Sequence, residues 1–435
     1  MKIKSLGMSL AVVAALSLSF TGCGEDDEKS NGGTPIQPSL SKSYMKLIGT
    51  TARDYANASA YDSSNNLYVV GQTKGDFETA QNSSTFDMFL RKLDSNGNTI
   101  CKFQYGTDHD DVATNVVVDS QNNIYVTGWT HRDFDGHTYA GGSEYKDGGD
   151  IFVMKFNSSC EKQSSILFGS TYREAPEGMS IDSDDNIYIT GWTNGSINNQ
   201  PFQGYTDFFI TKLNTDLTQI WTTQDGSDGY DWSKDIAVDT QGHLYVVGEL
   251  ENDIVGETSV MGGEDGFIAK YNTGDGSRIW ARSFGSANDS GGTDQATSVS
   301  LTSTGDAVVG FQAAGSDDSG VAYFDKDGTL KWRVATVGYS GIPVAVGKDD
   351  VIYSGDSDYG QRKTLRKFTK DGTQIWSAQM STTRTNYYMW HAELNYNPND
   401  GYVYVVGATE TNFAEPFQAD NNHSGSYDGF VMKFK

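Results

Sequence analysis

One short pattern recurs along the chain and constrains its fold more than any other feature. It consists of a polar turn, a run in which apolar residues alternate, and a glycine. The glycines of the successive copies are Gly71, Gly128, Gly191, Gly248, Gly310, Gly355 and Gly407. Neighbouring copies lie 45 to 63 residues apart. Alternation of this kind is typical of a half-buried strand, and self-similarity at a fixed period indicates a repeat architecture.

Each unit contains three further strand patterns. A second strand follows the glycine, as in DIFVMKF from Asp150. A third comes after a tight turn and carries a tryptophan in several units, at Trp221, Trp280, Trp332 and Trp376. A fourth, such as VVVD ending at Asp119, precedes the next copy of the pattern. Four short strands per unit, repeated radially, predict a β-propeller.

The two ends of the folded part complement each other. The chain ends on GFVMKFK, the third strand of its last unit, whereas SYMKLIGT from Ser43 reads as an isolated fourth strand. Pairing of Tyr44 to Ile48 with Phe430 to Phe434 would complete a blade and remove two exposed sheet edges. We therefore predict that residues 43–435 form an all-β, seven-bladed propeller of four-stranded blades, with an N-terminal strand completing the C-terminal blade.

The repeated residues also resemble a known family. The order G-[ST]-x-x-x-D, a strand ending in Asp, N-x-Y-V-x-G and D-x-F-hydrophobic-x-K resembles the SBBP repeat, a seven-bladed β-propeller repeat of exported bacterial proteins. The copy nearest to that pattern runs from Gly106 to Thr130, and the resemblance extends from Ser43 to Lys435 with the fifth and sixth units degenerate. It implies the fold but no activity, because propellers host unrelated chemistries.

The N-terminus has the features of an export signal. Lys2 and Lys4 precede an apolar stretch from Met8 to Leu18 that is too short to span a bilayer as a mature helix. The following Phe20-Thr21-Gly22-Cys23 resembles the lipobox of bacterial lipoproteins, in which the cysteine is acylated. We expect a signal peptide over 1–22, lipidation at Cys23 and a flexible tether over 23–42. The alternative is an ordinary signal peptide with a chance cysteine.

Charge and the residues after Cys23 suggest a location. Gly24, rather than Asp, follows the cysteine, which by resemblance to lipoprotein sorting favours the outer membrane. The acidic residues 25–28 resemble surface-export signals, so exposure at the cell surface is a hypothesis. The net charge of −25 argues against nucleic-acid partners and anionic lipid surfaces. We expect a monomer that meets the membrane only through its lipid.

Two cysteines remain in the predicted propeller. Cys101 stands where other units carry tryptophan, whereas Cys160 lies in the preceding turn of its unit. An oxidising compartment permits a disulfide. Because the two repeat positions differ, a bridge is neither supported nor excluded by the sequence.

Five carboxylates recur eight residues before the end of the predicted innermost strand. They are Asp54, Asp111, Glu174, Asp231 and Asp294. The innermost strand of a propeller lines its central channel, so these residues are candidates for a cation site or an acidic rim at one mouth. The alternative is structural: each carboxylate accepts hydrogen bonds from loop N–H groups and fixes a link between blades. A residue repeated in most units favours the structural role.

Aromatic residues supply the other candidate ligand contacts. Trp129 and Trp192 follow the repeat glycine in adjacent units, next to the predicted long loops. Aromatic rings flanked by acids and amides commonly hold neutral sugars, although the indoles can instead pack between blades. Small residues stand two positions after each of the five carboxylates: Ala56, Ala113, Pro176, Ser233 and Ala296. The last unit breaks this rule around His391, which marks a site or plugs the channel.

No catalytic or metal-binding pattern stands out. The sequence has no Gly-x-Ser-x-Gly, no His-Glu-x-x-His and no phosphate loop, so we assign no catalytic residue. Calcium is the one cofactor that the sequence suggests, through the polar loop 130–150 and aspartate-rich turns that equally suit hairpins. We expect a non-enzymatic binding or scaffold propeller that engages a protein or a glycan. The alternative is a hydrolase or lyase acting at the channel mouth through the acids and His391.

Overall fold

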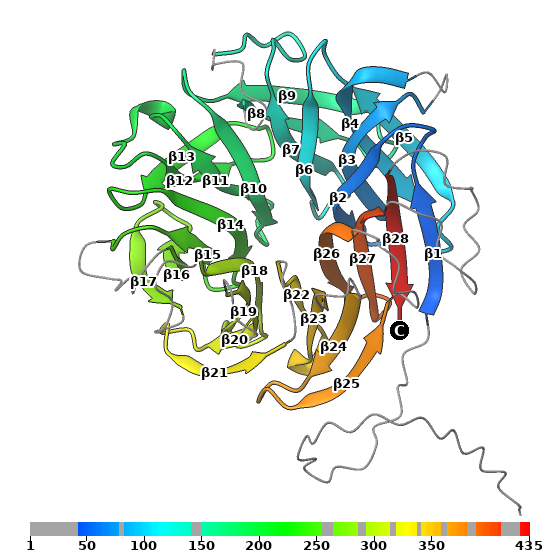
Figure 1. The fold of residues 1–435 in the computed structure, drawn as a ribbon. Coiled ribbons are helices and arrows are strands. Elements are labelled where there is room, and N and C mark those ends of the chain that lie inside the picture. The colour runs from blue at the N-terminus through cyan, green and yellow to red at the C-terminus, as the bar shows by residue number, and fades with distance from the viewer. Residues whose placement is uncertain are drawn as a thin grey trace, which may run out of the picture. The chain divides into compact units, whose positions relative to one another are not determined.

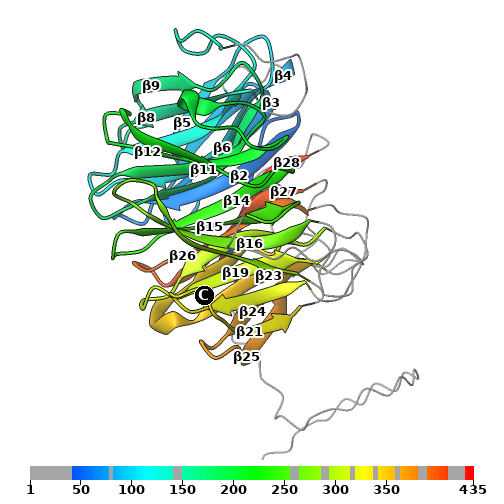
Figure 2. The same cartoon turned by 90° about the vertical axis from the view of Figure 1, so that its left-hand side faces the viewer.

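The computed structural model describes residues 42–77, 82–140, 149–254, 264–285, 293–313, 319–336, 341–357, 363–380, 389–409 and 427–435. These residues form seven four-stranded antiparallel sheets arranged as a ring (Figure 1). In the side view the strands run along the axis of the ring, so the connections between strands lie on its two faces (Figure 2). In the part of the chain that the structure describes, no helix is long and apolar enough to cross a bilayer.

The first four blades follow one another in sequence, each from its innermost to its outermost strand. Blade 1 consists of β2 (Asp54–Tyr61), β3 (Leu67–Gly75), β4 (Asn82–Leu93) and β5 (Thr99–Tyr105). Blade 2 consists of β6 (Asp111–Val118), β7 (Ile124–Thr130), β8 (Asp150–Phe156) and β9 (Lys162–Phe168). Blade 3 consists of β10 (Glu174–Ile181), β11 (Ile187–Thr193), β12 (Asp207–Leu213) and β13 (Gln219–Asp225), with a 3₁₀ turn η1 (Ile197–Asn199). Blade 4 consists of β14 (Asp231–Val238), β15 (His243–Leu250), β16 (Asp265–Asn272) and β17 (Arg278–Phe284).

The remaining three blades complete the ring. Blade 5 consists of β18 (Gln295–Leu301), β19 (Ala307–Gln312), β20 (Gly320–Phe324) and β21 (Leu330–Ala335). Blade 6 consists of β22 (Val344–Val346), β23 (Ile352–Ser357), β24 (Lys363–Phe368) and β25 (Gln374–Gln379), with η2 (Lys348–Asp350). Blade 7 consists of β26 (Met389–Asn397), β27 (Tyr402–Thr409), β28 (Asp428–Phe434) and the N-terminal β1 (Lys42–Ile48).

The predicted closure is confirmed. Strand β1 pairs antiparallel with β28, and Tyr44 faces Lys433 while Ile48 faces Gly429. The two chain ends therefore meet in one sheet, side by side in Figure 1. Because β1 occupies the outer edge of blade 7, the ring is closed by ordinary strand pairing and needs no further element.

The hydrophobic core lies between the blades. Seven clusters of buried side chains are present among the described residues, and each joins two adjacent blades. At the closing junction, for example, Ile48 and Val431 of blade 7 pack with Val69 and Phe89 of blade 1. A blade alone would expose one such face on each side, so the packing stabilises the ring as a whole.

The repeated Tyr, Lys and Asp residues form one buried polar unit inside a blade. In blade 1 the Tyr68 hydroxyl donates to Asp62 Oδ2 at 3.2 Å, and Lys92 Nζ lies 4.9 Å from the centre of the Tyr68 ring. Lys92 also pairs with Asp62 at 3.2 Å. The same stacking of lysine on tyrosine joins Lys155 to Tyr125, Lys212 to Tyr188, Lys270 to Tyr245 and Lys433 to Tyr404. These repeat residues therefore serve the fold, which every blade requires.

The repeat glycine allows the inner strand to approach closely. A Cβ on Gly71 would lie 1.8 Å from the carbonyl oxygen of Tyr55, and a Cβ on Gly128 would lie 1.9 Å from that of Val112. In both blades the contact falls beside a β-bulge of the innermost strand. Any other residue would displace that backbone, which explains why glycine recurs in the repeat.

Cys101 and Cys160 form a disulfide, with their Cα atoms 6.0 Å apart. The bond joins β5 of blade 1 to the turn between β8 and β9 of blade 2. At other junctions the tryptophan of one outer strand packs on the corresponding turn glycine of the next blade, as Trp221 does on Gly276 and Trp280 on Gly328. The two cysteines occupy different repeat positions, but these positions contact each other across the junction between adjacent blades. The difference in repeat position is therefore compatible with a disulfide.

Candidate functional site

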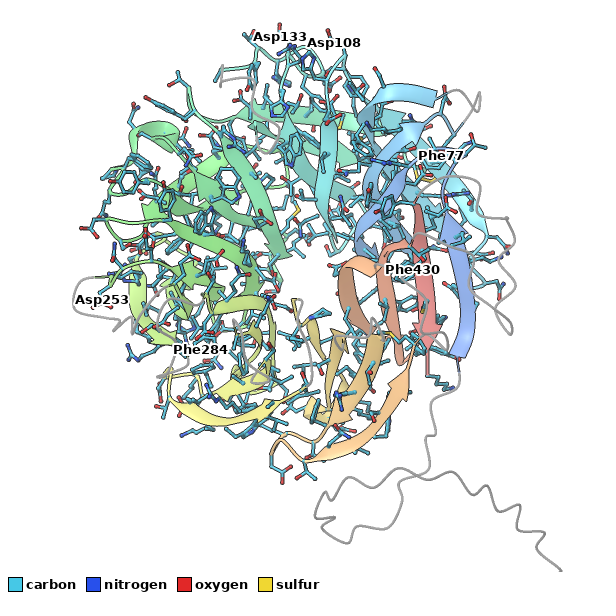
Figure 3. The ribbon with its side chains drawn as sticks, viewed as in Figure 1. Phe77, Asp108, Asp133, Asp253, Phe284 and Phe430 are labelled. Carbon is cyan, nitrogen blue, oxygen red and sulfur yellow. A yellow bond between two sulfur atoms is a disulfide. The ribbon has the colours of Figure 1, made fainter. Side chains whose placement is uncertain are left out.

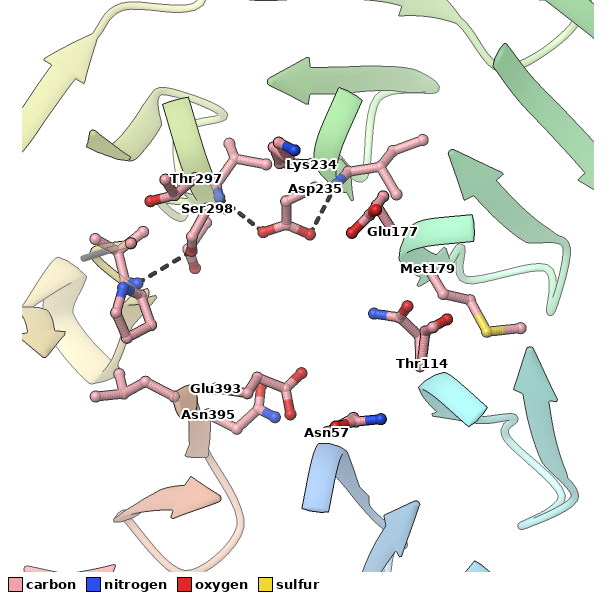
Figure 4. Close-up of a pocket in the computed structure, with 18 of the residues that line it drawn as sticks. Asn57, Thr114, Glu177, Met179, Lys234, Asp235, Thr297, Ser298, Glu393 and Asn395 are labelled. Atoms are coloured by element: carbon pink, nitrogen blue, oxygen red, sulfur yellow. Dashed lines mark hydrogen bonds between the residues drawn. The ribbon is translucent and has the colours of Figure 1, made fainter. Parts of the chain in front are cut away.

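The seven innermost strands surround a central cavity of about 1280 Å³ (Figure 4). Polar side chains from several blades gather around the axis of this cavity, among them Asn57, Glu177, Asp235 and Glu393. A cavity of this size is large enough for a small molecule or for the end of a longer chain. It is the place where the fold brings together residues from every blade.

A β-bulge sets the polar wall of the cavity. The register of the innermost strand shifts by one residue in β2, β6, β10, β14 and β18. All five of the extra residues line the cavity: Asn57, Thr114, Glu177, Lys234 and Thr297. Bulges commonly redirect a side chain at a functional site. We call these five residues the bulge belt.

The bulge belt differs from the rest of the repeat in one respect. The residues that build the blades recur with the same identity, whereas the belt carries an amide, a hydroxyl, a carboxylate and an ammonium group in successive blades. Two of its members also join adjacent blades: Asn57 Nδ2 donates to Ala113 O at 2.8 Å, and Thr297 Oγ1 donates to Ile342 O at 3.1 Å. The belt therefore combines contacts between blades with a wall of varied polar groups.

The predicted aromatic residues lie at one mouth of this cavity. Trp129 and Trp192 are half-buried, occupy the ends of β7 and β11, and both line the cavity. Tyr55 of blade 1 and Tyr427 beside blade 7 also line the cavity, and their rings stack with centroids 5.3 Å apart. Four aromatic side chains thus border the mouth on the face that carries the long loops.

Neighbouring groups hold the ring of Trp192. Its indole Nε1 donates to Glu177 Oε1 at 3.1 Å, which ties the ring to the bulge belt. The Arg173 guanidinium lies 5.5 Å from the ring centre. Trp129 instead packs beside His131, with ring centroids 5.0 Å apart. Both indoles are therefore positioned by polar neighbours and retain partial exposure to the cavity.

The charged groups of the belt are paired. Lys234 Nζ lies 3.2 Å from Glu249 Oε1. Burial alone would lower the pKa of Lys234, but the carboxylates of Glu177 and Glu249 raise it overall, so the ammonium form is stabilised. The pair leaves an electrically asymmetric wall, with a cation on blade 4 next to an acid on blade 3.

Two further carboxylates face the cavity deeper inside. Burial raises the pKa of Glu393 to about 8 and that of Asp235 to about 6. Both remain hydrogen-bonded to backbone N–H groups: Ser59 N donates to Glu393 at 2.5 Å, and Val299 N donates to Asp235 at 2.8 Å. Each bond joins adjacent innermost strands, so the two acids tie neighbouring blades together. Figure 4 draws the hydrogen bonds of Asp235.

Four of the five recurring carboxylates begin an innermost strand, Asp294 directly precedes β18, and none of the five lines the cavity. Each of these residues is at most 4 % exposed. Four accept a backbone hydrogen bond four residues back along the chain: Asp54 from Thr50, Asp111 from Thr107, Glu174 from Ser170 and Asp231 from Ser227. This geometry favours the structural interpretation, and ligand binding by Asp54, Asp111, Glu174, Asp231 and Asp294 stays a prediction.

Other predicted positions fall partly outside the description. The side chain of His391 lies outside the described residues, as does Cys23. In the loop after β7, Asp135 pairs with Lys162, and His137 Nε2 is 3.1 Å from Ser165 Oγ. Over the described ranges no group of three or more His, Cys, Asp or Glu side chains is placed to hold a metal ion. Calcium binding stays a prediction.

Sequence reasoning did not find the bulge belt. The available signal was the small residue two positions after each carboxylate, because the bulge begins directly after it. A period-two pattern hides such a residue, since one inserted position shifts the alternation. Tyr55 and Tyr427 were also missed.

Comparisons with known proteins agree with this architecture. Residues 104–135 and 167–198 match the SBBP β-propeller repeat. The chain is a β-propeller repeat protein with two SBBP-matching segments. Its SBBP-matching segments cover the junctions into blades 2 and 3, including Trp129 and Trp192, and the resemblance seen in the sequence is confirmed there.

Two relatives show how far the likeness extends. The chain is 23 % identical over 188 residues to the regulatory protein FlaEY of Caulobacter vibrioides, and this match spans 40 % of the chain but only 20 % of FlaEY. The solved WD40 domain of Pan2 from Neurospora crassa aligns over 90 % of the chain and 95 % of that domain, with a TM-score of 0.54 and 8 % identity. At this identity the second likeness concerns the fold alone.

Proposed function

We propose that this protein is a non-enzymatic, lipid-anchored binding propeller of the cell envelope that holds a glycan at the aromatic mouth of its channel. The observation that carries the proposal is the combination of Trp129 and Trp192 with the bulge belt in one cavity. Aromatic rings offer flat apolar faces to sugar rings, and nearby amide and carboxylate oxygens accept hydrogen bonds from sugar hydroxyl groups. The fold supplies a rigid frame for both.

The carboxylates of the channel support binding rather than hydrolysis. A glycosidase needs one acid that is free to donate a proton and a second carboxylate across the scissile bond. Glu393 and Asp235 are instead engaged by backbone N–H groups of neighbouring strands, and the recurring acids are buried away from the cavity. We therefore propose no reaction for this cavity.

Two single substitutions test the glycan site. The full-length chain is screened on a glycan array, and the best glycan is measured by calorimetry against Trp129→Ala and Trp192→Ala. Loss of a stacking ring should weaken binding about tenfold each. Trp221→Ala is the matched control, because this tryptophan packs between outer strands of blades 3 and 4, far from the mouth. Unchanged affinity in both mouth variants, or no glycan bound at all, would refute the proposal.

The proposed anchor is tested separately. Cys23→Ser should abolish metabolic labelling with a palmitate analogue and move the protein from the membrane fraction to the soluble fraction. Protease treatment of intact cells then reports whether the propeller is exposed at the surface. A Cys23→Ser protein that still carries lipid and sediments with membranes would contradict lipidation at this residue.

A further inference from the structure

A second aromatic surface lies on the long-loop face outside the cavity. It consists of Tyr205, Tyr230 and Trp232, which stack in that order with centroids 5.1 Å and 5.5 Å apart and interplanar angles of 23° and 11°. We call these three residues the aromatic column. Tyr205 is 66 % exposed and Tyr230 is 40 % exposed. Since Tyr230 covers one face of Tyr205, the outer face of Tyr205 is open to a ligand.

The column is held by backbone contacts rather than left on a loose loop. Tyr205 N donates to Gly229 O at 2.9 Å, and Asp231 N donates to Thr206 O at 2.9 Å. Glu251 N in turn donates to Tyr230 O at 3.0 Å. Three segments from blades 3 and 4 are thereby joined, so the backbone that carries the column is held by hydrogen bonds.

The three segments around the column carry only negative charge. Residues 201–206, 227–230 and 251–254 contain Asp228, Glu251 and Asp253 but no Lys, Arg or His. Asp228 and Asp253 are exposed, and Asp253 lies at the rim of the ring in Figure 3. Glu251 Oε2 accepts a hydrogen bond from Tyr230 N at 2.9 Å, which keeps its carboxylate beside the column.

In two other blades a guanidinium group lies over an aromatic ring near the start of the innermost strand. The residue before the recurring acid is Arg53 in blade 1 and Arg173 in blade 3, and their guanidinium groups lie over Tyr427 at 5.7 Å and over Trp192 at 5.5 Å. Blade 4 has Tyr230 at the same position. Within the described ranges, no cation lies over a ring of the aromatic column. Blade 4 therefore has exposed aromatic rings at this position but no arginine of its own to stack on them.

We propose that the aromatic column binds an arginine side chain presented by a partner protein. The planar guanidinium stacks on the open face of Tyr205, and the exposed carboxylate of Asp228 accepts its N–H groups. An ammonium group cannot form both contacts equally well, because it lacks the planar fork of donors. This surface recognises a different ligand from the glycan proposed for the channel and stands independently of it.

The test uses a fluorescein-labelled octapeptide, Gly-Gly-Arg-Gly-Gly-Arg-Gly-Gly, and its lysine counterpart at physiological salt. Fluorescence anisotropy with the full-length chain should show tighter binding of the arginine peptide. Tyr205→Ala should weaken it about tenfold, and Tyr205→Phe should restore it, since the ring rather than the hydroxyl makes the contact. Tyr172→Ala is the matched control, because Tyr172 is 60 % exposed but lies outside the column.

Three outcomes would overturn the proposal. One is the absence of measurable arginine-peptide binding. Another is equal binding by the parent and Tyr205→Ala, which would indicate attraction to the negative net charge alone. The third is loss of binding in Trp129→Ala with no change in Tyr205→Ala, which would place the peptide in the channel. Failure of the glycan array leaves these measurements unaffected, so the two proposals are tested independently.

Discussion

Cys101 and Cys160 replace both partners of a contact that other blades make with tryptophan and glycine. Trp332 packs on Gly372 at the junction of blades 5 and 6, in the same manner as Trp221 and Trp280 at their junctions. Between blades 1 and 2 neither partner is present, and the disulfide joins the two positions instead. A covalent link therefore does at this junction what aromatic packing does elsewhere.

The equivalence of the disulfide and the tryptophan–glycine contact can be tested by replacing one with the other. Replacing both cysteines by serine should lower the free energy of unfolding by about 2–4 kcal/mol, because the bond closes a loop between residues 59 apart in sequence. The double variant Cys101→Trp with Cys160→Gly should recover part of that loss by rebuilding the packing contact. Urea unfolding without reductant measures all three proteins. A serine variant as stable as the parent would show that the bond stabilises nothing.

Single strands also have unequal roles, and β1 is the strand on which closure depends. Its Leu47 and Ile48 are buried in two different hydrophobic clusters. The cluster of Leu47 joins blades 6 and 7, and that of Ile48 joins blades 7 and 1. Removing residues 24–41 should leave the propeller intact, since β1 begins at Lys42. Extending the deletion through Thr50 should lower stability by about 4 kcal/mol or more and promote aggregation, because β28 becomes an exposed edge.

Two measurements check the seam. Thermal unfolding compares the two deletions, with the shorter one as the matched control. Cysteines placed at the paired positions Lys46 and Val431 should also crosslink in the native full-length protein. Melting of the longer deletion at the parent's temperature, together with no crosslink, would exclude the closed ring in solution.

At the scale of elements the sequence was sufficient for the fold and insufficient for the site. Alternation and the leftover strand at Ser43 predicted every blade. These features arise because each of the seven blades buries apolar side chains in the same way. The bulge belt escaped notice, since a bulge interrupts alternation at the position that matters, as at Asn57. The placement of Asp54 away from the cavity also depends on side-chain direction, which spacing does not reveal.

The molecule as a whole contains a large number of buried carboxylates. Burial raises the pKa of Asp54, Asp111 and Asp150 to about 6. It raises the pKa of Glu174 and Asp231 to about 7. Most of these groups also feel a second carboxylate nearby, as Glu174 feels Asp150. Because these groups are distributed around the ring, we expect the stability of the propeller to depend on pH.

The direction of that dependence follows from proton binding. A carboxylate whose pKa is higher in the folded state binds more protons there than in the unfolded chain, so stability falls as the pH rises through that interval. The interval here runs from about pH 4, the ordinary pKa of these groups, to about pH 8, where Glu393 titrates. Turn aspartates such as Asp182 and Asp306 have lowered pKa values, and their stabilising contribution is lost only below about pH 4.

We therefore expect the propeller to be most stable near pH 5 and to lose several degrees of melting temperature between pH 5 and pH 8. The net charge of −25 acts in the same direction, because self-repulsion grows as the remaining acids ionise. Calorimetry in buffers of matched ionic strength with EDTA measures the trend, and Glu174→Gln should reduce its slope by removing one titrating group. A parallel series with added calcium in place of EDTA shows whether calcium ions, rather than protons, neutralise the buried carboxylates. A melting temperature that is constant or rising from pH 5 to pH 8 would show that the buried acids are ionised at little cost.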